Sequence, residues 1–121
     1  MKILLDTNFL IYCVKEKIDY IEELRTLIKG EYELIVLDQV IEELQRLSKK
    51  AKKYSDKQAS ELALKLLRLN KIRTIKGLGK NADDSMIKKS KGNIIATVDL
   101  DLARQLERTI VVRGRRKLVF R

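Results

Sequence analysis

Short apolar runs alternate along the chain with longer stretches in which apolar residues recur every three or four positions. The runs predict strands at 2–5, 34–37, 72–75, 94–98, 109–112 and 118–120. The spaced stretches predict helices at 8–15, 20–29 and 100–106, and further helices that begin near 39, 55 and 82. Strands that alternate with helices in this way indicate an α/β fold, a single three-layer domain with a mainly parallel sheet.

Turn and cap signals mark the ends of several of these elements. Gly30 is expected to end the second helix as its C′ residue, and Asp38 is expected to cap the next one. The segment 55–58 has the pattern of a capping box. The helix behind it is expected to bury Ala59, Leu62, Leu66 and Leu69. The loop 76–81 has two glycines but lacks the spacing of a phosphate-binding loop, which favours a mobile connection.

Length and residue usage limit the chemistry that the chain can perform. Its 121 residues suit one domain, 1–121, with a core that needs no disulfide. The single cysteine, Cys13, lies in an apolar stretch and is expected to be a core residue. There is no histidine, which excludes Ser-His and Cys-His catalytic systems and most catalytic zinc sites. Carboxylates remain as the reactive groups.

Basic residues outnumber acidic ones by 27 to 17, which gives a net charge of +10. A surplus of this size favours a polyanionic partner such as nucleic acid. The alternative is the charged surface of a heat-tolerant protein, because 36% of the residues are charged and proline is absent. No apolar stretch has the length of a signal peptide or a membrane span, so we expect a cytoplasmic protein with no membrane partner.

Four acids are expected at one edge of the predicted sheet. Asp6 and Asp99 each close a strand, Glu43 lies on the helix after the second strand, and Asp84 opens the helix after 72–75. The carboxyl ends of parallel strands meet at one edge, where α/β sheets bind ligands. Each acid alone could be explained by helix capping or solvation, but four together would repel one another unless a cation neutralised them.

The helix that begins near 39 carries two neighbouring acids, of which only one can face the site. Its apolar stripe consists of Val40, Ile41, Leu44 and Leu47. At about 100° per residue, Glu43 borders this stripe and Glu42 points nearly away from it. We therefore expect Glu43 at the site and Glu42 in solvent, beside Arg46.

A cluster of carboxylates without His or Cys suits a hard divalent cation, Mg²⁺ or Mn²⁺. An acidic site of this kind within a basic protein suggests a metal centre served by a surface that holds phosphates. The matching chemistry is metal-assisted hydrolysis of a phosphodiester bond.

Four short motifs carry a resemblance to a known family. They are Leu4-Leu5-Asp6-Thr7-Asn8, Val40-Ile41-Glu42-Glu43-Leu44, Ala82-Asp83-Asp84-Ser85-Met86-Ile87 and Ala96-Thr97-Val98-Asp99-Leu100-Asp101-Leu102. In this order and at these separations they resemble the PIN-domain ribonucleases, over essentially the whole chain. The resemblance implies a sheet ordered 3-2-1-4-5 and Mg²⁺- or Mn²⁺-dependent endonuclease activity on RNA.

The resemblance also implies roles for individual residues. The catalytic and metal-binding acids would be Asp6, Glu43, Asp84 and Asp99. The supporting residues around the metal or its water would be Thr7, Asn8, Asp83, Thr97 and Asp101. Asp38 departs from the family's toxins, which commonly carry Ser, Thr or Pro near this position.

The resulting hypothesis is a metal-dependent endoribonuclease, either the toxin of a toxin–antitoxin pair or an RNA-processing nuclease. The residues of the third and fourth motifs, together with the basic C-terminal segment, resemble the RNA-processing members more closely than the toxins. The partners would be RNA and either an antitoxin or a ribosomal precursor, and the sequence leaves a homodimer open. The alternatives are a non-catalytic RNA-binding or ribosome-assembly PIN domain and a DNA-directed nuclease of related fold.

Two basic clusters are expected to contact RNA phosphates. The first, the basic bend, consists of Lys49, Lys50, Lys52 and Lys53. The second, the basic turn, consists of Arg113, Arg115, Arg116 and Lys117. Such contacts would position RNA without reading its sequence, and the alternative is that both clusters are solvated loops.

Overall fold

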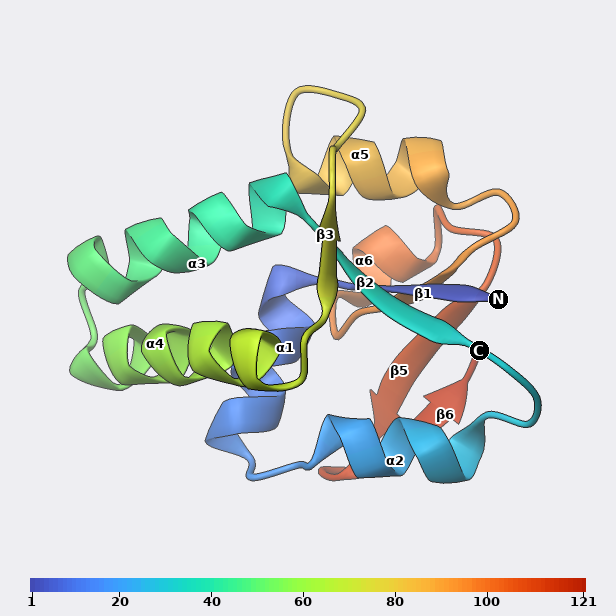
Figure 1. The fold of residues 1–121 in the computed structure, drawn as a ribbon, viewed down its shortest axis with the longest axis horizontal. Coiled ribbons are helices and arrows are strands. Elements are labelled where there is room, and N and C mark those ends of the chain that lie inside the picture. Colours follow the sequence, from blue (N-terminus) through green and yellow to red (C-terminus); the bar gives the residue numbers. More distant parts are fainter.

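A six-stranded sheet forms the centre of the computed structural model, which describes all 121 residues (Figure 1). Its strands are β1 (Lys2–Leu5), β2 (Glu33–Leu37), β3 (Arg73–Ile75), β4 (Ile94–Ala96), β5 (Thr109–Arg113) and β6 (Lys117–Phe120). They are ordered β3-β2-β1-β4-β5-β6, and β6 alone is antiparallel to its neighbour. The predicted α/β fold and the strand order 3-2-1-4-5 are confirmed, with β6 added beside β5.

Six helices connect the strands and cover both faces of the sheet. They are α1 (Thr7–Lys15), α2 (Tyr20–Leu27), α3 (Asp38–Lys50), α4 (Tyr54–Leu69), α5 (Ala82–Lys89) and α6 (Leu100–Ala103). Parallel crossovers are right-handed, so those from β1 to β3 and those from β3 to β5 leave the sheet on opposite faces. Figure 1 shows α1 and α2 on one side, and α5 and α6 on the other. The direction reverses between β1 and β4, where α/β sheets bind ligands.

The two central strands are buried along almost their whole length. Ile3, Leu4 and Leu5 pair with the residues of β4 and have no exposed surface. The backbone N–H of Asp6 continues this pairing by donating to the carbonyl oxygen of Ala96 at 3.0 Å. The core therefore fixes Asp6 at the carboxyl edge of the sheet.

Several helix ends differ from the sequence prediction. Asp38 is the first residue of α3 and not its cap, because the N-cap is Leu37 and no side chain caps this helix. Helix α2 ends at Leu27, because Ile28 takes an extended conformation and buries its side chain. Gly30, with φ of +94°, therefore lies beyond the helix and is not its C′ residue. Helix α4 begins after Lys53 with no side-chain cap hydrogen bond, so the predicted capping box at 55–58 is wrong.

The buried face of α4 also differs from the predicted one. The helix buries Ala59, Ser60, Ala63 and Leu67. Of the expected stripe, Leu62 is 44% exposed and Leu69 is 66% exposed. Helix α4 packs against both α3 and α1, and α3 and α4 form an antiparallel hairpin that projects past the sheet (Figure 1). No helix of the chain combines the length and the apolar character needed to cross a bilayer.

Candidate active site

Asp6 is the innermost acid at the carboxyl edge of the sheet. It is 2% exposed, and its carboxylate accepts from Thr97 Oγ1 at 2.8 Å and from the N–H of Thr7 at 2.9 Å. Burial raises the pKa of Asp6 to about 6, against the opposing effect of the Thr97 hydrogen bond, and the nearby charge of Asp83 adds to the rise. The site therefore holds an acid that ionises with difficulty unless a positive charge is near.

Asp6 forms part of a pocket of about 400 Å³ between β1, α3 and α5. The pocket is lined by Asp6, Asn8, Glu43, Arg46, Leu47, Asn81, Ala82 and Asp83. Glu43 is half-buried, whereas Glu42 is exposed and lines a separate groove beside α4. Arg46 was expected beside Glu42, but it approaches Glu43 instead, at 3.8 Å. The structure thus brings three carboxylates and one guanidinium to a single hollow.

The first turn of α5 contributes Asp83 to this pocket and directs Asp84 elsewhere. Asp83 is exposed at the rim of the pocket, and partial loss of solvent around its carboxylate raises its pKa, with the charges of Asp99 and Glu43 adding to the rise. Asp84 Oδ2 instead accepts from the N–H of Lys80 at 3.0 Å and pairs with Lys88 Nζ at 3.3 Å. These contacts, first the backbone bond and then Lys88, lower the pKa of Asp84. The acid that faces Asp6 and Glu43 is therefore Asp83, and Asp84 holds the loop before the helix.

Asp99 lies next to these acids but already has a structural role. Its Oδ1 accepts from the N–H groups of Asp101 and Leu102 at 3.0 and 3.1 Å, which caps the short helix α6. Its own N–H donates to Thr97 Oγ1 at 3.1 Å, so Thr97 ties Asp99 to Asp6. Both cap bonds use Oδ1, which leaves Oδ2 for a ligand.

The remaining supporting residues are placed differently from one another. Asn8 is exposed and lines the pocket. Thr7 is buried, and its Oγ1 has no hydrogen-bond partner in the chain. Asp101 is exposed and pairs with Arg104 at 2.8 Å, so it does not face the pocket. Of these three residues, Asn8 is thus the one with direct access to a ligand.

The donor set fits a hard divalent cation. Asp6, Glu43 and Asp83 present carboxylate oxygens to the same pocket, and the raised pKa values of Asp6 and Asp83 reflect lost solvation and repulsion by neighbouring carboxylates. No three acids lie close enough together to hold one ion directly. Mg²⁺ usually keeps several waters and binds one or two carboxylates, so this spacing suits an ion held partly through water.

The basic bend follows α3 away from the pocket, whereas the basic turn adjoins the far end of α1. Helix α3 contributes Glu43 and Arg46 to the pocket and, beyond them, the first two lysines of the basic bend. Lys15 at the end of α1 pairs with Asp56 of α4, just after the bend. Tyr12 donates its hydroxyl hydrogen bond to the carbonyl oxygen of Arg115, and Arg115 pairs with Glu16 at 3.4 Å. The end of α1 thus contacts both the start of α4 and the basic turn.

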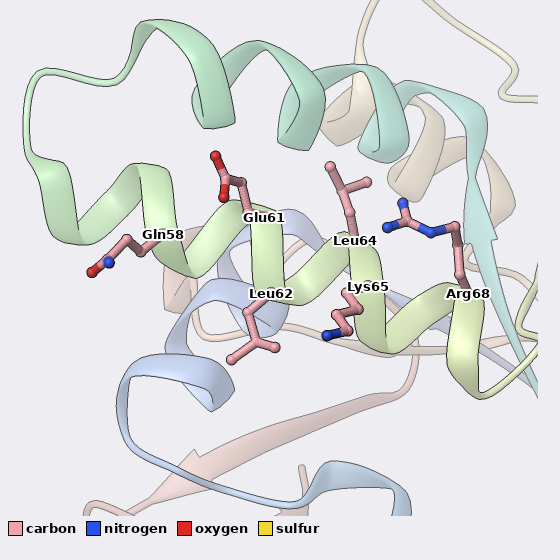
Figure 2. Close-up of a pocket in the computed structure, with 6 residues that line it drawn as sticks. All are labelled: Gln58, Glu61, Leu62, Leu64, Lys65 and Arg68. Atoms are coloured by element: carbon pink, nitrogen blue, oxygen red, sulfur yellow. The ribbon is translucent and has the colours of Figure 1, made fainter.

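A second hollow, of about 500 Å³, lies on the outer surface of α4. Figure 2 shows that Glu61, Leu64 and Arg68 point toward α3, whereas Leu62 and Lys65 point away from it. Glu61 is the one acid that lines this hollow. The hollow therefore lacks the donor set of the pocket beside Asp6.

Two pocket residues, Arg46 and Asn81, were not predicted as part of the site. Arg46 lies three positions after Glu43 on the same helix, a spacing that brings side chains together. Asn81 is the N-cap of α5 and accepts from the N–H of Asp84 at 2.9 Å. An asparagine before a helix with acids in its first turn is a cap signal that the sequence contains.

Comparison with known proteins gives a family and related folds. The sequence pattern of a family described as a PIN like domain matches residues 3–117. Ribonuclease VapC4 of Methanocaldococcus jannaschii is 32% identical over 108 residues, which cover 87% of this chain and 82% of that protein.

Solved structures share the arrangement of strands and helices. The PIN domain endonuclease Utp24 aligns with a TM-score of 0.77 at 22% identity, over 97% of this chain and 90% of that chain. VapBC2 from Rickettsia felis, bound to a DNA fragment from its promoter, aligns with a TM-score of 0.64 at 18% identity, over 93% and 100% of the respective chains. At these identities the likeness shows a common fold.

Proposed function

The chain belongs to the PIN-like domain family, and from that premise we propose that it is a metal-dependent endoribonuclease. The observation that carries the proposal is the convergence of Asp6, Glu43 and Asp83 on one pocket at the β1–β4 crevice, with Asp99 close to Asp83. We assign the active centre to these four acids. Asp83 thus takes the role that the motif alone gave to Asp84.

The residues of the pocket divide the work of binding and orientation. Bound Mg²⁺ or Mn²⁺ would neutralise the carboxylates, activate a water and stabilise charge on the scissile phosphate. Thr97 and the Thr7 N–H hold the Asp6 carboxylate in one direction, so little reorganisation is needed when a substrate enters. Arg46, at the rim, supplies a positive charge that can orient a phosphate oxygen.

We further propose that RNA reaches the pocket across the basic bend and the basic turn. The proposal is supported by the exposure of every residue of both clusters and by the contacts of the end of α1 with the start of α4 and with the basic turn. Phosphate contacts of this kind fix the path of a strand but do not select its sequence. Single-stranded or looped RNA is the expected substrate, because the bond to be cut must enter the pocket.

The relatives are of two kinds, and each kind suggests a different biological role for this chain. VapC4 and VapBC2 carry the name of toxin–antitoxin proteins, and Utp24 is named as an endonuclease. A toxin would act in the cytoplasm with an antitoxin partner, and a processing enzyme would act on ribosomal precursors. A small antitoxin-like gene directly upstream would support the first role, and ribosome-related neighbours would support the second. A homodimer is compatible with either role.

The test of the proposal is cleavage of a labelled RNA containing a single-stranded loop. The purified protein should cut it with Mg²⁺ or Mn²⁺ and lose this activity in excess EDTA. Asp6→Asn and Asp99→Asn should each remove nearly all cleavage, whereas Asp101→Asn should retain it, because Asp101 pairs with Arg104 outside the pocket. RNA binding without metal-dependent cleavage would instead support a non-catalytic RNA-binding domain.

A further inference from the structure

The position of Asp83 depends on how the short helix α5 is held against α3. Helix α5 has eight residues, of which Ala82, Ser85 and Met86 are buried. Asp83 and Glu43 must approach each other to share the pocket, yet their charges repel when no cation is present. Burial of Ala82 and Met86 in the core opposes that repulsion, and a direct contact between α3 and α5 would oppose it further.

The side chain of Gln39 makes this contact. Its Nε2 donates to the carbonyl oxygen of Gly79 at 3.1 Å, and its Oε1 accepts a hydrogen bond from the Ser85 hydroxyl. Ser85 is fully buried, so Gln39 satisfies a hydroxyl that water cannot reach. The bridge thus links the first turns of α3 and α5.

The loop between β3 and α5 fits closely around this bridge. Asp38 Oδ1 accepts from the N–H of Gly77 at 2.9 Å and from that of Gln39 at 2.8 Å. A Cβ at Gly77 would lie 2.1 Å from Gln39 Oε1, and a Cβ at Gly79 would lie 2.2 Å from Asp84 Oδ2. The two glycines therefore permit close approach, and the predicted mobile loop is instead held by side chains from both helices.

Gln39 and Glu43 lie four positions apart on α3 and so share one helix face, one turn apart. Ser85 and Asp83 lie together in the first half of α5. We propose that Gln39 is a positioning residue: it holds the first turn of α5 at the separation from α3 at which Asp83 and Glu43 share one pocket. This inference rests on the proposed function for the pocket, because it treats Asp83 as one of the acids that hold the ion.

The experiment compares variants that remove the bridge with a matched control. Gln39→Met keeps the length of the side chain and removes both hydrogen bonds, and Ser85→Ala removes one of them. Gln45→Met makes the same change at an exposed position of α3 outside the pocket. Titration calorimetry gives the Mn²⁺ affinity of each metal-free protein, and cleavage kinetics give kcat and KM for RNA.

Loss of an outer partner of a metal ligand typically weakens binding 10- to 100-fold. We expect Gln39→Met to weaken Mn²⁺ binding about tenfold and to lower kcat while the KM for RNA stays unchanged. Ser85→Ala should have a smaller effect, and the double variant should match Gln39→Met, because both changes act on one bridge. Wild-type Mn²⁺ affinity in Gln39→Met, or an equal loss in Gln45→Met, would overturn the proposal.

Amide hydrogen exchange in EDTA tests the bridge without metal or RNA. Gln39→Met should expose the N–H groups of Gly77, Lys80 and Asp84 to faster exchange, while those of the sheet stay protected. Unchanged exchange would show that Gln39 does not hold the loop. If the wild-type protein neither binds Mn²⁺ nor cuts RNA, the proposed function fails, and the exchange result still decides whether Gln39 fixes the first turn of α5.

Discussion

Replacing Asp6 with asparagine should make the metal-free protein more stable at neutral pH, although it removes the innermost acid of the site. Burial raises the pKa of Asp6 from 3.8 to about 6, so the folded state binds this proton more tightly than the unfolded state. The stability that the proton provides is fully present below about pH 4 and is lost as the pH rises to about 6. Asparagine has no charge to bury and does not titrate in this range.

The size of the effect follows from the shift in pKa. A difference of about two pKa units corresponds to about 3 kcal/mol. Asp6 is 2% exposed, so solvent screening does not reduce this value appreciably. The pKa of about 6 already includes the hydrogen bonds that the carboxylate accepts from Thr7 and Thr97. The gain is therefore about 3 kcal/mol near neutral pH.

Urea unfolding followed by circular dichroism, in EDTA and at several values between about pH 4 and pH 8, measures this difference. The variant should match wild type at the acidic end, where Asp6 is also neutral, and should be more stable by about 3 kcal/mol at the neutral end. The control Asp101→Asn should follow the wild-type profile, because Asp101 is exposed. Parallel profiles for Asp6→Asn and wild type would refute the reasoning, because the carboxylate would then be no harder to ionise in the folded state.

Further predictions concern cleavage and RNA binding. Asp83→Asn should lose most RNA cleavage and Mn²⁺ affinity. Asp84→Asn should retain a measurable fraction of both and should instead lower the midpoint of thermal unfolding. The reverse pattern would assign the catalytic role to Asp84. Under the same metal concentrations, Glu43→Gln should lose most cleavage and Glu42→Gln should not, and equal losses would mean that α3 is rotated. Neutralising the basic bend should flatten the salt dependence of RNA binding by roughly 0.7 for each phosphate contact removed, whereas Lys29→Gln, at an exposed lysine just after α2, should not.

The fold could be predicted because its strands are short and apolar, and because a helix follows each of the first four strands. The face of α4 could not, because two sets of residues on this helix have helical spacing. Leu62, Leu66 and Leu69 form the more apolar set, yet they line an open groove beside the start of α2. The set that is buried is made largely of small residues, on a helix that packs against both α3 and α1. Helical periodicity shows that a helix has a packing face, but close approach between helices selects the smaller side chains.

Sequence alone identifies Asp83 and Asp84 as a pair, but it does not show which of the two faces the pocket. Asn81 caps α5, and Lys88 lies one turn after Asp84, so the sequence contains enough to assign Asp84 to contacts within its own helix. That assignment leaves Asp83 free without saying what it faces. Its direction depends on Gln39, 44 residues earlier along the chain, whose amide bridges a loop and a buried hydroxyl. A contact between helices that are distant in sequence leaves no periodic pattern in the sequence. The motif therefore identifies the two acids, and the packing of α5 against α3 determines which of them faces the pocket.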